Sequence, residues 1–320
     1  MILGLDIGGA NTKAASSDGS FTRIDYLPLW KGARLVPLLR RLSRQAEPEA
    51  LAVVMTGELA DCFSNKRTGI LSIKDAVEGS FSCPIKFWGV DGFGWTEIGD
   101  LAAANWSASA HLVSEEIGDC LFVDMGSTTT DLIPIKSGPK AAKTDFERLA
   151  NGELIYSGLL RTNLAVLLRG VEIGGRRVPL SSELFAIAAD AHLALGEIAE
   201  DDYSVEPPDG GGRDRISALR RLARAVCADL EEIGSDGAAE IARQARSCQS
   251  RLLTEGICRA AERHTLHLVV AAGIGEGMIE EAARNLDLEC VRLSERYGSG
   301  VSEVFPAYAA ARLLEMEPSG

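Results

Sequence analysis

The sequence predicts an α/β fold built from two similar halves. Short apolar segments with strand character alternate with amphipathic segments of helical spacing along the 320 residues, a pattern typical of this class. One apolar segment ends at Asp6 and a second at Asp124, and each is followed by a glycine turn and a hydroxyl-rich return. Because this loop design occurs twice, and because a domain usually contains about 100–200 residues, we expect two related domains.

The first half is expected to open with a hairpin that turns at Gly8-Gly9. Leucines between positions 35 and 42 recur at helical spacing and predict an amphipathic helix, and a buried strand stops at the turn Thr56-Gly57. The predicted elements are strands over 2–5, 12–16 and 51–55, and helices around 35–42 and over 98–112.

The second half is expected to be richer in helices. Apolar residues between positions 216 and 230 form one face of a helix, and the stretch 207–212, rich in proline and glycine, marks a loop. The predicted strands cover 120–123, 132–135, 266–271 and 289–293. The predicted helices cover 153–168, 181–195, 214–232, 237–247, 249–263, 276–285 and 302–315.

Charge and composition argue against several classes of function. Acidic residues outnumber basic ones by 46 to 33, and a net charge of -13 argues against binding to nucleic acid or to an anionic membrane. We find no stretch of about 18 apolar residues that could span a membrane and no signal peptide, so we expect a cytoplasmic protein. The seven cysteines are scattered without a C-x-x-C pair, which argues against a disulfide framework or a zinc cluster.

The segment from Asp6 to Lys13 is the first candidate for a functional site. Glycines let backbone N–H groups approach a phosphate closely, and hydroxyl and ammonium groups add charge-assisted hydrogen bonds. A strand-end carboxylate suits hydrated Mg²⁺, so Asp6 is the candidate metal ligand. The candidates for phosphate binding are Gly8, Gly9, Asn11, Thr12 and Lys13. Taken alone, the glycine pair is better explained by a tight hairpin turn.

The segment from Asp124 to Asp131 repeats the same design, and a third segment with glycines follows the predicted strand 266–271. Asp124 is the second candidate metal ligand. The further candidates for diphosphate or nucleotide binding are Gly126, Ser127, Thr128 and Thr129, together with Gly273 and Gly275 of the third segment. Each segment alone is a common turn. Together, the first two supply what a clamped, metal-bound diphosphate needs.

These three segments, in this order, resemble the two phosphate motifs and the adenosine motif of the actin/sugar-kinase/Hsp70 superfamily. The alanine-rich segment after Pro306 stands where that superfamily has its final connecting helix, so the resemblance covers nearly the whole chain. It implies a two-domain actin-like (ribonuclease H-like) fold with a central cleft. The implied domains are 1–118, completed by a C-terminal helix over 305–320, and 119–304, with a helical insertion at about 150–265.

Six further stretches carry a narrower resemblance; they are 56–63, 104–106, 144–149, 152–158, 161–162 and 221–224. They resemble the hydantoinase/oxoprolinase-like proteins of the tetrahydromethanopterin-linked one-carbon pathway, a family similar to the methanofuran-biosynthesis synthase of methanogenic archaea. The resemblance implies a transferase with two small-molecule substrates. It would join an aminomethylfuran-methyl diphosphate to the phenol of γ-glutamyltyramine as an ether and release diphosphate.

This implied reaction gives roles to the candidate residues. Mg²⁺ on Asp6 and Asp124, together with Lys13, would stabilise the charge that develops on the leaving diphosphate. Asp131 and Asp145 are candidates for the base that accepts the proton of the phenol. Turn capping by Asp131 and helix N-capping by Asp145 explain these two carboxylates at least equally well.

The remaining candidates concern the organic parts of the substrates. Arg148 and Arg161 are candidates for binding the carboxylate of the γ-glutamyl group, and ion pairs with Glu147 or Glu153 are the competing interpretation. Aromatic rings can stabilise a cation-like furfuryl carbon, although such rings more often belong to a core. The aromatic candidates are Trp30, Trp88, Trp95 and Tyr26.

The alternative function is that of an ATP-dependent small-molecule kinase or an amidohydrolase of the hydantoinase/oxoprolinase type. Such kinases usually have a richer glycine run where this chain has Ala271-Ala272, so ATP is a candidate cofactor that the sequence does not favour. A non-catalytic ATP switch or filament protein ranks last. The sequence leaves the oligomeric state open, a homo-oligomer included.

Overall fold

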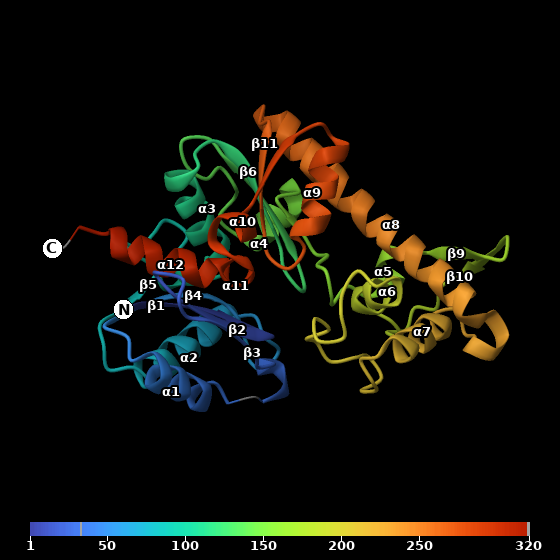
Figure 1. Ribbon diagram of the computed structural model, residues 1–320. Coiled ribbons are helices and arrows are strands. Elements are labelled where there is room, and N and C mark those ends of the chain that lie inside the picture. Colours follow the sequence, from blue (N-terminus) through green and yellow to red (C-terminus); the bar gives the residue numbers. More distant parts are fainter. Residues whose placement is uncertain (33, 319–320) are drawn as a thin grey trace.

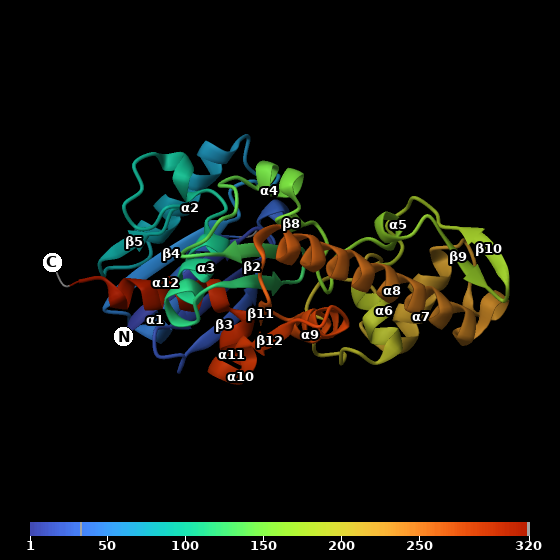
Figure 2. The ribbon, with the colours of Figure 1, turned by 90° about the horizontal axis from the view of Figure 1, so that it is seen from above.

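The computed structural model describes residues 1–32 and 34–318, and it contains two five-stranded sheets with helices packed around them (Figure 1). A lobe rich in helices extends to one side of the two sheets (Figure 2). In each sheet, the strand that ends at a candidate metal ligand lies inside the sheet, between an antiparallel partner and a parallel one. The structure therefore confirms the predicted α/β class and the repeated design of its two halves.

The first sheet is built around the strand that ends in the first glycine loop. In spatial order its strands are β3 (Thr22–Tyr26), β2 (Asn11–Ser16), β1 (Ile2–Gly8), β4 (Ala50–Thr56) and β5 (Ile85–Phe87). The alternation along β1 places Leu3, Leu5 and Ile7 on one face, where they are fully buried. That face packs against α1 (Leu35–Ala46) and α2 (Lys66–Glu78).

The second sheet repeats this plan around the strand that ends in the second loop. In spatial order its strands are β12 (Glu289–Arg292), β11 (Leu268–Ala272), β6 (Cys120–Met125), β7 (Thr130–Ile135) and β8 (Leu154–Ile155). One face packs against α9 (Glu276–Asn285) and the C-terminal half of α8 (Leu230–His264). Every residue of β6 and β7 is buried, as expected for strands covered on both faces.

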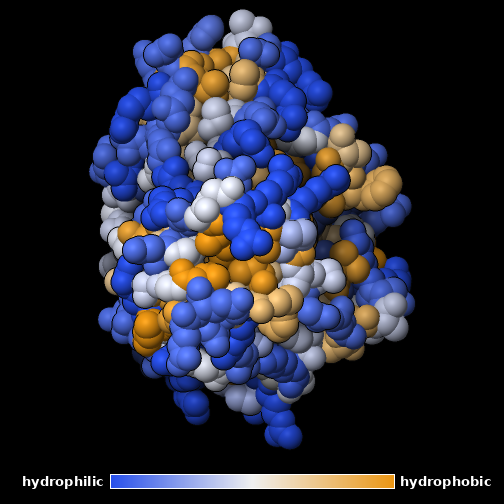
Figure 3. Space-filling model, turned by 90° about the vertical axis from the view of Figure 1, so that its right-hand side faces the viewer, coloured by the Kyte–Doolittle hydropathy of each residue, from blue (hydrophilic) through white to orange (hydrophobic). Residues whose placement is uncertain are grey.

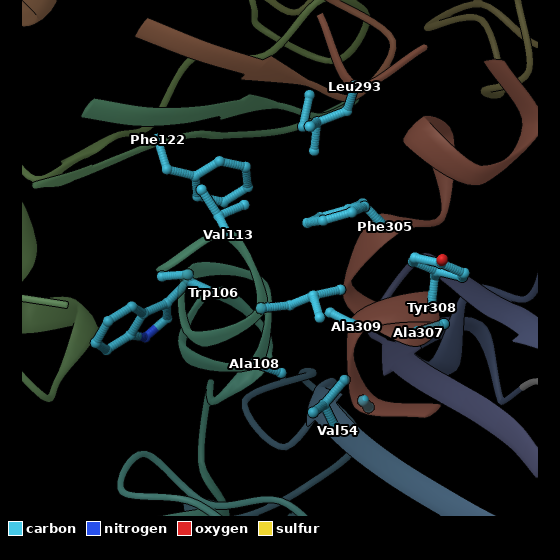
Figure 4. Close-up of a cluster of buried hydrophobic side chains, with 14 of the residues drawn as sticks. Val54, Trp106, Ala108, Val113, Phe122, Leu293, Phe305, Ala307, Tyr308 and Ala309 are labelled. Carbon is cyan, nitrogen blue, oxygen red and sulfur yellow. The ribbon is translucent and has the colours of Figure 1, made fainter. Parts of the chain in front are cut away.

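Two helices lie between the sheets and join them in one core: α3 (Asn105–Glu116) and α12 (Phe305–Met316). Phe305 contacts Phe122 of the second sheet, with ring centroids 6.0 Å apart (Figure 4). On its other side α12 lies so close to β1 that a Cβ atom at Gly4 would come within 1.8 Å of the Ala307 carbonyl oxygen. A glycine at position 4 is therefore needed for this close packing.

The lobe contains short elements inserted after the second loop. They are α5 (Leu164–Leu167), β9 (Gly170–Ile173), β10 (Arg176–Pro179), α6 (Ala188–Leu195) and α7 (Arg215–Arg224). β10 pairs with β9, and the other four pack on the N-terminal half of α8. A buried polar cluster holds its centre, where Arg221 Nε donates to Asp190 Oδ1 at 2.8 Å and Tyr203 donates to the same oxygen at 2.9 Å. Figure 3 shows the molecule from the side on which the lobe extends. This surface is mostly hydrophilic, and apolar groups are exposed near its middle.

Several predicted helices are wrong in their limits. Residues 153–168 contain β8 and a single helical turn, because Leu154 pairs with Asp131 of β7. The helices predicted over 237–247 and 249–263 are one helix, α8, and the helix predicted from 214 ends at Arg224, shortly before Cys227 adopts a φ of 58°. The helix predicted over 98–112 is interrupted at Ala103, where φ is 48°.

Other differences are smaller. The helix predicted over 181–195 begins only at Ala188, and the last helix begins at Phe305 with Pro306 in its first turn. The elements α2, β3, β5, β9 and β10 were not predicted from the sequence. The short elements that complete the chain are η1 (Leu29–Lys31), η2 (Ile98–Leu101), α4 (Asp145–Asn151), α10 (Leu293–Tyr297) and α11 (Ser299–Glu303).

The limits predicted for the two domains stay a prediction. The last predicted helix was drawn to residue 320, and residues 319–320 lie outside the described residues. Within residues 1–32 and 34–318, every helix is too short or too polar to cross a bilayer.

Candidate functional site

The two repeated loops face each other across one cleft. Its volume is about 520 Å³, and residues from both sheets line it. From the first loop come Asp6, Gly8, Gly9, Asn11 and Lys13, and from the second come Asp124, Gly126, Ser127, Thr128, Thr129 and Asp131. The prediction that the two Asp-Gly segments meet is therefore confirmed. The separate strand–turn–strand units of the two sheets each present a loop to the same space.

Asp6 and Asp124 are buried carboxylates at equivalent places near the ends of β1 and β6. Their exposed fractions are 5% and 8%. Burial raises the pKa of Asp6 to about 6 and that of Asp124 to about 7, while the nearby Lys13 ammonium lowers both pKa values. Asp6 Oδ1 has no hydrogen-bond partner among the described residues. A buried carboxylate pair with one unpartnered oxygen and a single nearby lysine is suited to a divalent cation.

The described residues contain no group of three or more His, Cys, Asp or Glu side chains arranged to hold a metal ion by themselves. A cation between Asp6 and Asp124 would therefore complete its coordination with water and phosphate oxygens. Mg²⁺ is normally bound in this way, through one or two carboxylates and retained waters. The residues present fit a hydrated Mg²⁺ that accompanies a phosphorylated ligand.

The second loop is held in shape by the segment that follows β8. The Gly126 N–H donates to the Thr129 carbonyl at 3.0 Å, which closes the turn. The Arg161 N–H donates to the Ser127 carbonyl at 2.8 Å from the other side. A Cβ atom at Gly158 would lie 2.5 Å from the Thr128 nitrogen, so only glycine allows this approach.

Three residues predicted to bind diphosphate or nucleotide do not line the cleft: Thr12, Gly273 and Gly275. Thr12 is 1% exposed, because it faces inward from β2 where that strand pairs with β1. Gly273 has a φ of 84°, and a Cβ atom there would lie 2.4 Å from Asp124 Oδ1. Gly275 donates its N–H to the Met125 carbonyl at 3.0 Å and lines a neighbouring cavity. The glycine motif therefore supports the Asp124 loop from behind.

Arg148 organises the two carboxylates that were candidates for the base. It is 1% exposed, and it forms an ion pair with Asp131 and a second with Asp145 at 3.1 Å. Its guanidinium group also lies 4.7 Å from the ring centre of Trp106. The predicted alternative pairing of Arg148 with the Glu147 or Glu153 carboxylate is wrong.

The alternative explanations of the two aspartates are also wrong. Thr144, not Asp145, is the N-cap of α4, and its hydroxyl accepts the Glu147 N–H. Asp131 lies within β7 in an ion pair with Arg148 and caps no turn. Burial raises the pKa of Asp145, and the Arg148 charge opposes this shift.

Arg161 stands on the rim of the cleft above Trp30, with its guanidinium carbon 4.8 Å from the ring centre. Tyr156 and Asp61 line the same rim. Within the described part of the chain, neither Arg161 nor Asp61 forms an ion pair. Of the other predicted aromatic residues, Trp88 and Trp95 belong to the core, and Tyr26 lines the neighbouring cavity.

Comparisons with known proteins agree with this geometry. A family model described as Hydantoinase/oxoprolinase matches residues 49–317. A protein of Methanocaldococcus jannaschii is 41% identical over 328 residues, which cover 99% of this chain and 98% of that protein. A protein of Methanococcus vannielii is 38% identical over 214 residues, covering 65% of this chain and 96% of that one. Both are named as synthases of a furan-2-yl-methanamine that carries a γ-glutamylaminoethyl-phenoxymethyl group.

One solved structure shows the fold. It is a ROK family glucokinase from Streptomyces griseus in complex with glucose and AMPPNP, 14% identical, with a TM-score of 0.51 over 98% of both chains. This likeness confirms the predicted actin-like, two-domain α/β fold. From the family model and the nearly full-length relative, the chain belongs to the hydantoinase/oxoprolinase family.

Proposed function

We propose that this protein is the transferase that forms the ether bond between an aminomethylfuran-methyl diphosphate and the phenol of γ-glutamyltyramine, with release of diphosphate, in methanofuran biosynthesis. The observation that carries the proposal is the 41% identity to the Methanocaldococcus jannaschii synthase over 99% of the chain. The product in that name contains the phenoxymethyl-furan ether, the aminomethyl group and the γ-glutamyl group of such a reaction.

The two loops are suited to hold the diphosphate. Gly8, Gly9 and Gly126 line the cleft without side chains that would keep a phosphate away from the backbone, and the Lys13 ammonium lies close enough to lower the pKa values of both buried aspartates. When bound at Asp6 and Asp124, Mg²⁺ would supply positive charge to the diphosphate oxygens. Lys13 would add a donor whose interaction strengthens as the carbon–oxygen bond breaks, because the bonding pair leaves with the diphosphate.

The rim of the cleft is suited to the acceptor. Tyr156 and Trp30 offer aromatic faces to the tyramine ring, and Arg161 offers a cation to the γ-glutamyl carboxylate. In the reaction the phenol oxygen forms a bond to the furfuryl carbon and loses its proton. We assign that proton to Asp145, because it is half-exposed at the cleft and burial raises its pKa, whereas Asp131 is more deeply buried in its ion pair with Arg148.

The test is the release of diphosphate from the two substrates by the purified protein, with and without ATP. We expect turnover without any nucleotide. Lys13→Ala should lower the rate by about 100- to 1000-fold, the usual effect of removing one donor to a charge that grows in the transition state. Lys140→Ala is the matched control, because this exposed lysine lies outside the cleft. Strict dependence on ATP, with ADP as a product, would contradict the proposal and favour a kinase or amidohydrolase.

A further inference from the structure

A second cavity of about 680 Å³ adjoins the phosphate cleft. Asn11 lines both spaces. The walls of the second cavity come from many parts of the fold, among them β3 of the first sheet, the start of α9, the segment that follows α6 in the lobe, α8 and the end of α11. A ligand anchored by its diphosphate between the two loops can therefore extend into this cavity past Asn11.

The walls of the cavity are formed by aliphatic side chains and one aromatic side chain. Ile24, Leu159, Ile274 and Met278 contribute aliphatic surface, and Tyr26 adds an aromatic side chain. Surfaces of this kind bury a small ring through the hydrophobic effect. The apolar part of the cavity thus fits a flat heterocycle, which is the shape of the furan in the diphosphate substrate.

The charges in the cavity are predominantly negative. Two basic side chains line the cavity, His192 and Arg246, and both contact the carboxylate of Glu197. His192 Nδ1 lies 2.6 Å and Arg246 Nε 3.0 Å from its oxygens. Asp201 and Glu303 also line the cavity, and neither has an ion-pair or hydrogen-bond partner among the described side chains. The cavity therefore carries carboxylates without matching cations.

Glu303 lines the second cavity within electrostatic range of Lys13, which lines the phosphate cleft. The Lys13 ammonium lowers its pKa, as it lowers those of Asp6 and Asp124, so one lysine is close to all three carboxylates. Burial outweighs this and raises the pKa of Glu303. A half-buried carboxylate without a partner gains most from a ligand that brings its own positive charge.

The two proposed substrates differ in the charges that they carry. The acceptor has a carboxylate next to its amine, and it fits the rim where Arg161 and Asp61 offer one cation and one anion. The donor has a single ammonium group on the furan, opposite the diphosphate. Unpaired carboxylates attract the isolated ammonium of the donor, whereas the carboxylate beside the amine of the acceptor offsets this attraction. Charge thus separates the two substrates between the two spaces.

We propose that the second cavity is the site for the aminomethylfuran, and that Glu303 binds its ammonium group while the diphosphate lies between the two loops. This inference rests on the proposed function for the identity of the ligand. The cavity is then a specificity site for a furfurylammonium, in a position that communicates with the phosphate loops through Asn11.

The first test uses binding alone, so that it does not depend on turnover. Furfurylamine is titrated into the full-length protein, and furfuryl alcohol serves as the uncharged probe. Glu303→Gln keeps the shape of the side chain and should weaken furfurylamine binding by about 10- to 100-fold, with little effect on the alcohol. Glu200→Gln is the matched control, because this exposed glutamate lies near the cavity without lining it. Equal affinity of wild type and Glu303→Gln for furfurylamine would overturn the inference.

The second test uses the reaction. The KM for the aminomethylfuran diphosphate should rise by about 10- to 100-fold in Glu303→Gln, whereas the KM for γ-glutamyltyramine should stay unchanged. With a diphosphate that carries methyl in place of aminomethyl, wild type and variant should behave alike. A variant that loses both substrates equally, or a nucleotide that displaces furfurylamine, would overturn the inference. If the wild type binds furfurylamine but shows no turnover, only the proposed function fails.

Discussion

Asp124→Asn should stabilise the metal-free protein at alkaline pH while abolishing its activity. In the fold, burial raises the pKa of Asp124 from 3.8 to about 7. One pKa unit corresponds to about 1.4 kcal/mol, so a difference of about three units destabilises the folded state by on the order of 4 kcal/mol once the carboxylate is charged. Asparagine has nearly the same shape and carries no charge, so it removes this cost.

The sign of this stability difference follows from the order in which Asp124 loses its proton in the unfolded and in the folded state. Below pH 3.8 the carboxyl group is protonated in both states and contributes nothing. Between pH 3.8 and about 7 the unfolded state binds fewer protons than the folded state, so the free energy of unfolding falls as the pH rises. Above pH 7 the Asp124 carboxylate is charged in both states, and the folded state is destabilised by the full amount. The stability difference between variant and wild type should therefore be near zero at pH 3.5 and largest at pH 8.

The measurement is denaturation by urea at both pH values, without divalent cations, with the variant and the wild type side by side. Asp75→Asn, at an exposed position on α2, is the control and should change the free energy of unfolding by less than about 0.5 kcal/mol. Added Mg²⁺ with diphosphate should stabilise the wild type more than Asp124→Asn. A variant less stable than the wild type at pH 8 would refute the reasoning, because it would mean that the charged carboxylate is well accommodated without a cation.

Three further predictions concern packing. Gly158→Ala would bring a Cβ atom within 2.5 Å of the Thr128 nitrogen and displace the second loop, so diphosphate should no longer protect the protein against heat. Arg221→Met leaves Asp190 as an unpaired buried charge and should lower the free energy of unfolding by about 3–5 kcal/mol, measured by urea denaturation. Gly4→Ala forces α12 away from β1 and should cost at least about 1–3 kcal/mol in the same assay.

The control for both glycine variants is Gly94→Ala, because a Cβ atom at Gly94 has open space around it. It should leave stability and diphosphate protection essentially unchanged. Retained protection in Gly158→Ala would show that the loop does not need its close contact with the segment after β8. Wild-type stability in Arg221→Met or Gly4→Ala would contradict the packing described for the lobe or for α12.

The two loops could be predicted from the sequence because their determinants are local. A buried strand, an aspartate near its end and a glycine turn lie within eight residues, and strand pairing then fixes the direction of each loop. That both loops would meet at one cleft was predicted from their repetition together with the resemblance to the actin/sugar-kinase/Hsp70 superfamily. The position of Asp6 and Asp124 at one cleft agrees with this prediction, and their role as metal ligands stays a prediction.

The partners of Arg148 could not be predicted in the same way. The sequence places Glu147 and Glu153 near it, but the side chain turns toward Asp131, which is 17 residues away on β7. The same long-range pairing makes Leu154 a strand residue although its surroundings have helical spacing. In both places a tertiary contact overrides a local preference, so the local pattern misleads.

The second cavity had only a partial signal in the sequence. Asn11 and Gly275, which line it, belong to predicted motifs, but its other walls come from segments that are far apart in the chain, and Glu303 belongs to no motif. The phosphate loops and the second cavity are separate parts of the site, so the reaction can differ while the loops stay the same. A kinase and the proposed transferase must both stabilise negative charge on phosphate oxygens, so both benefit from the same pair of loops. They differ in the bond that breaks, phosphorus–oxygen in one and carbon–oxygen in the other, and hence in the group that must lie beside the phosphates. In the proposed transferase that group is the furan with its ammonium, which we assign to the cavity beside Asn11.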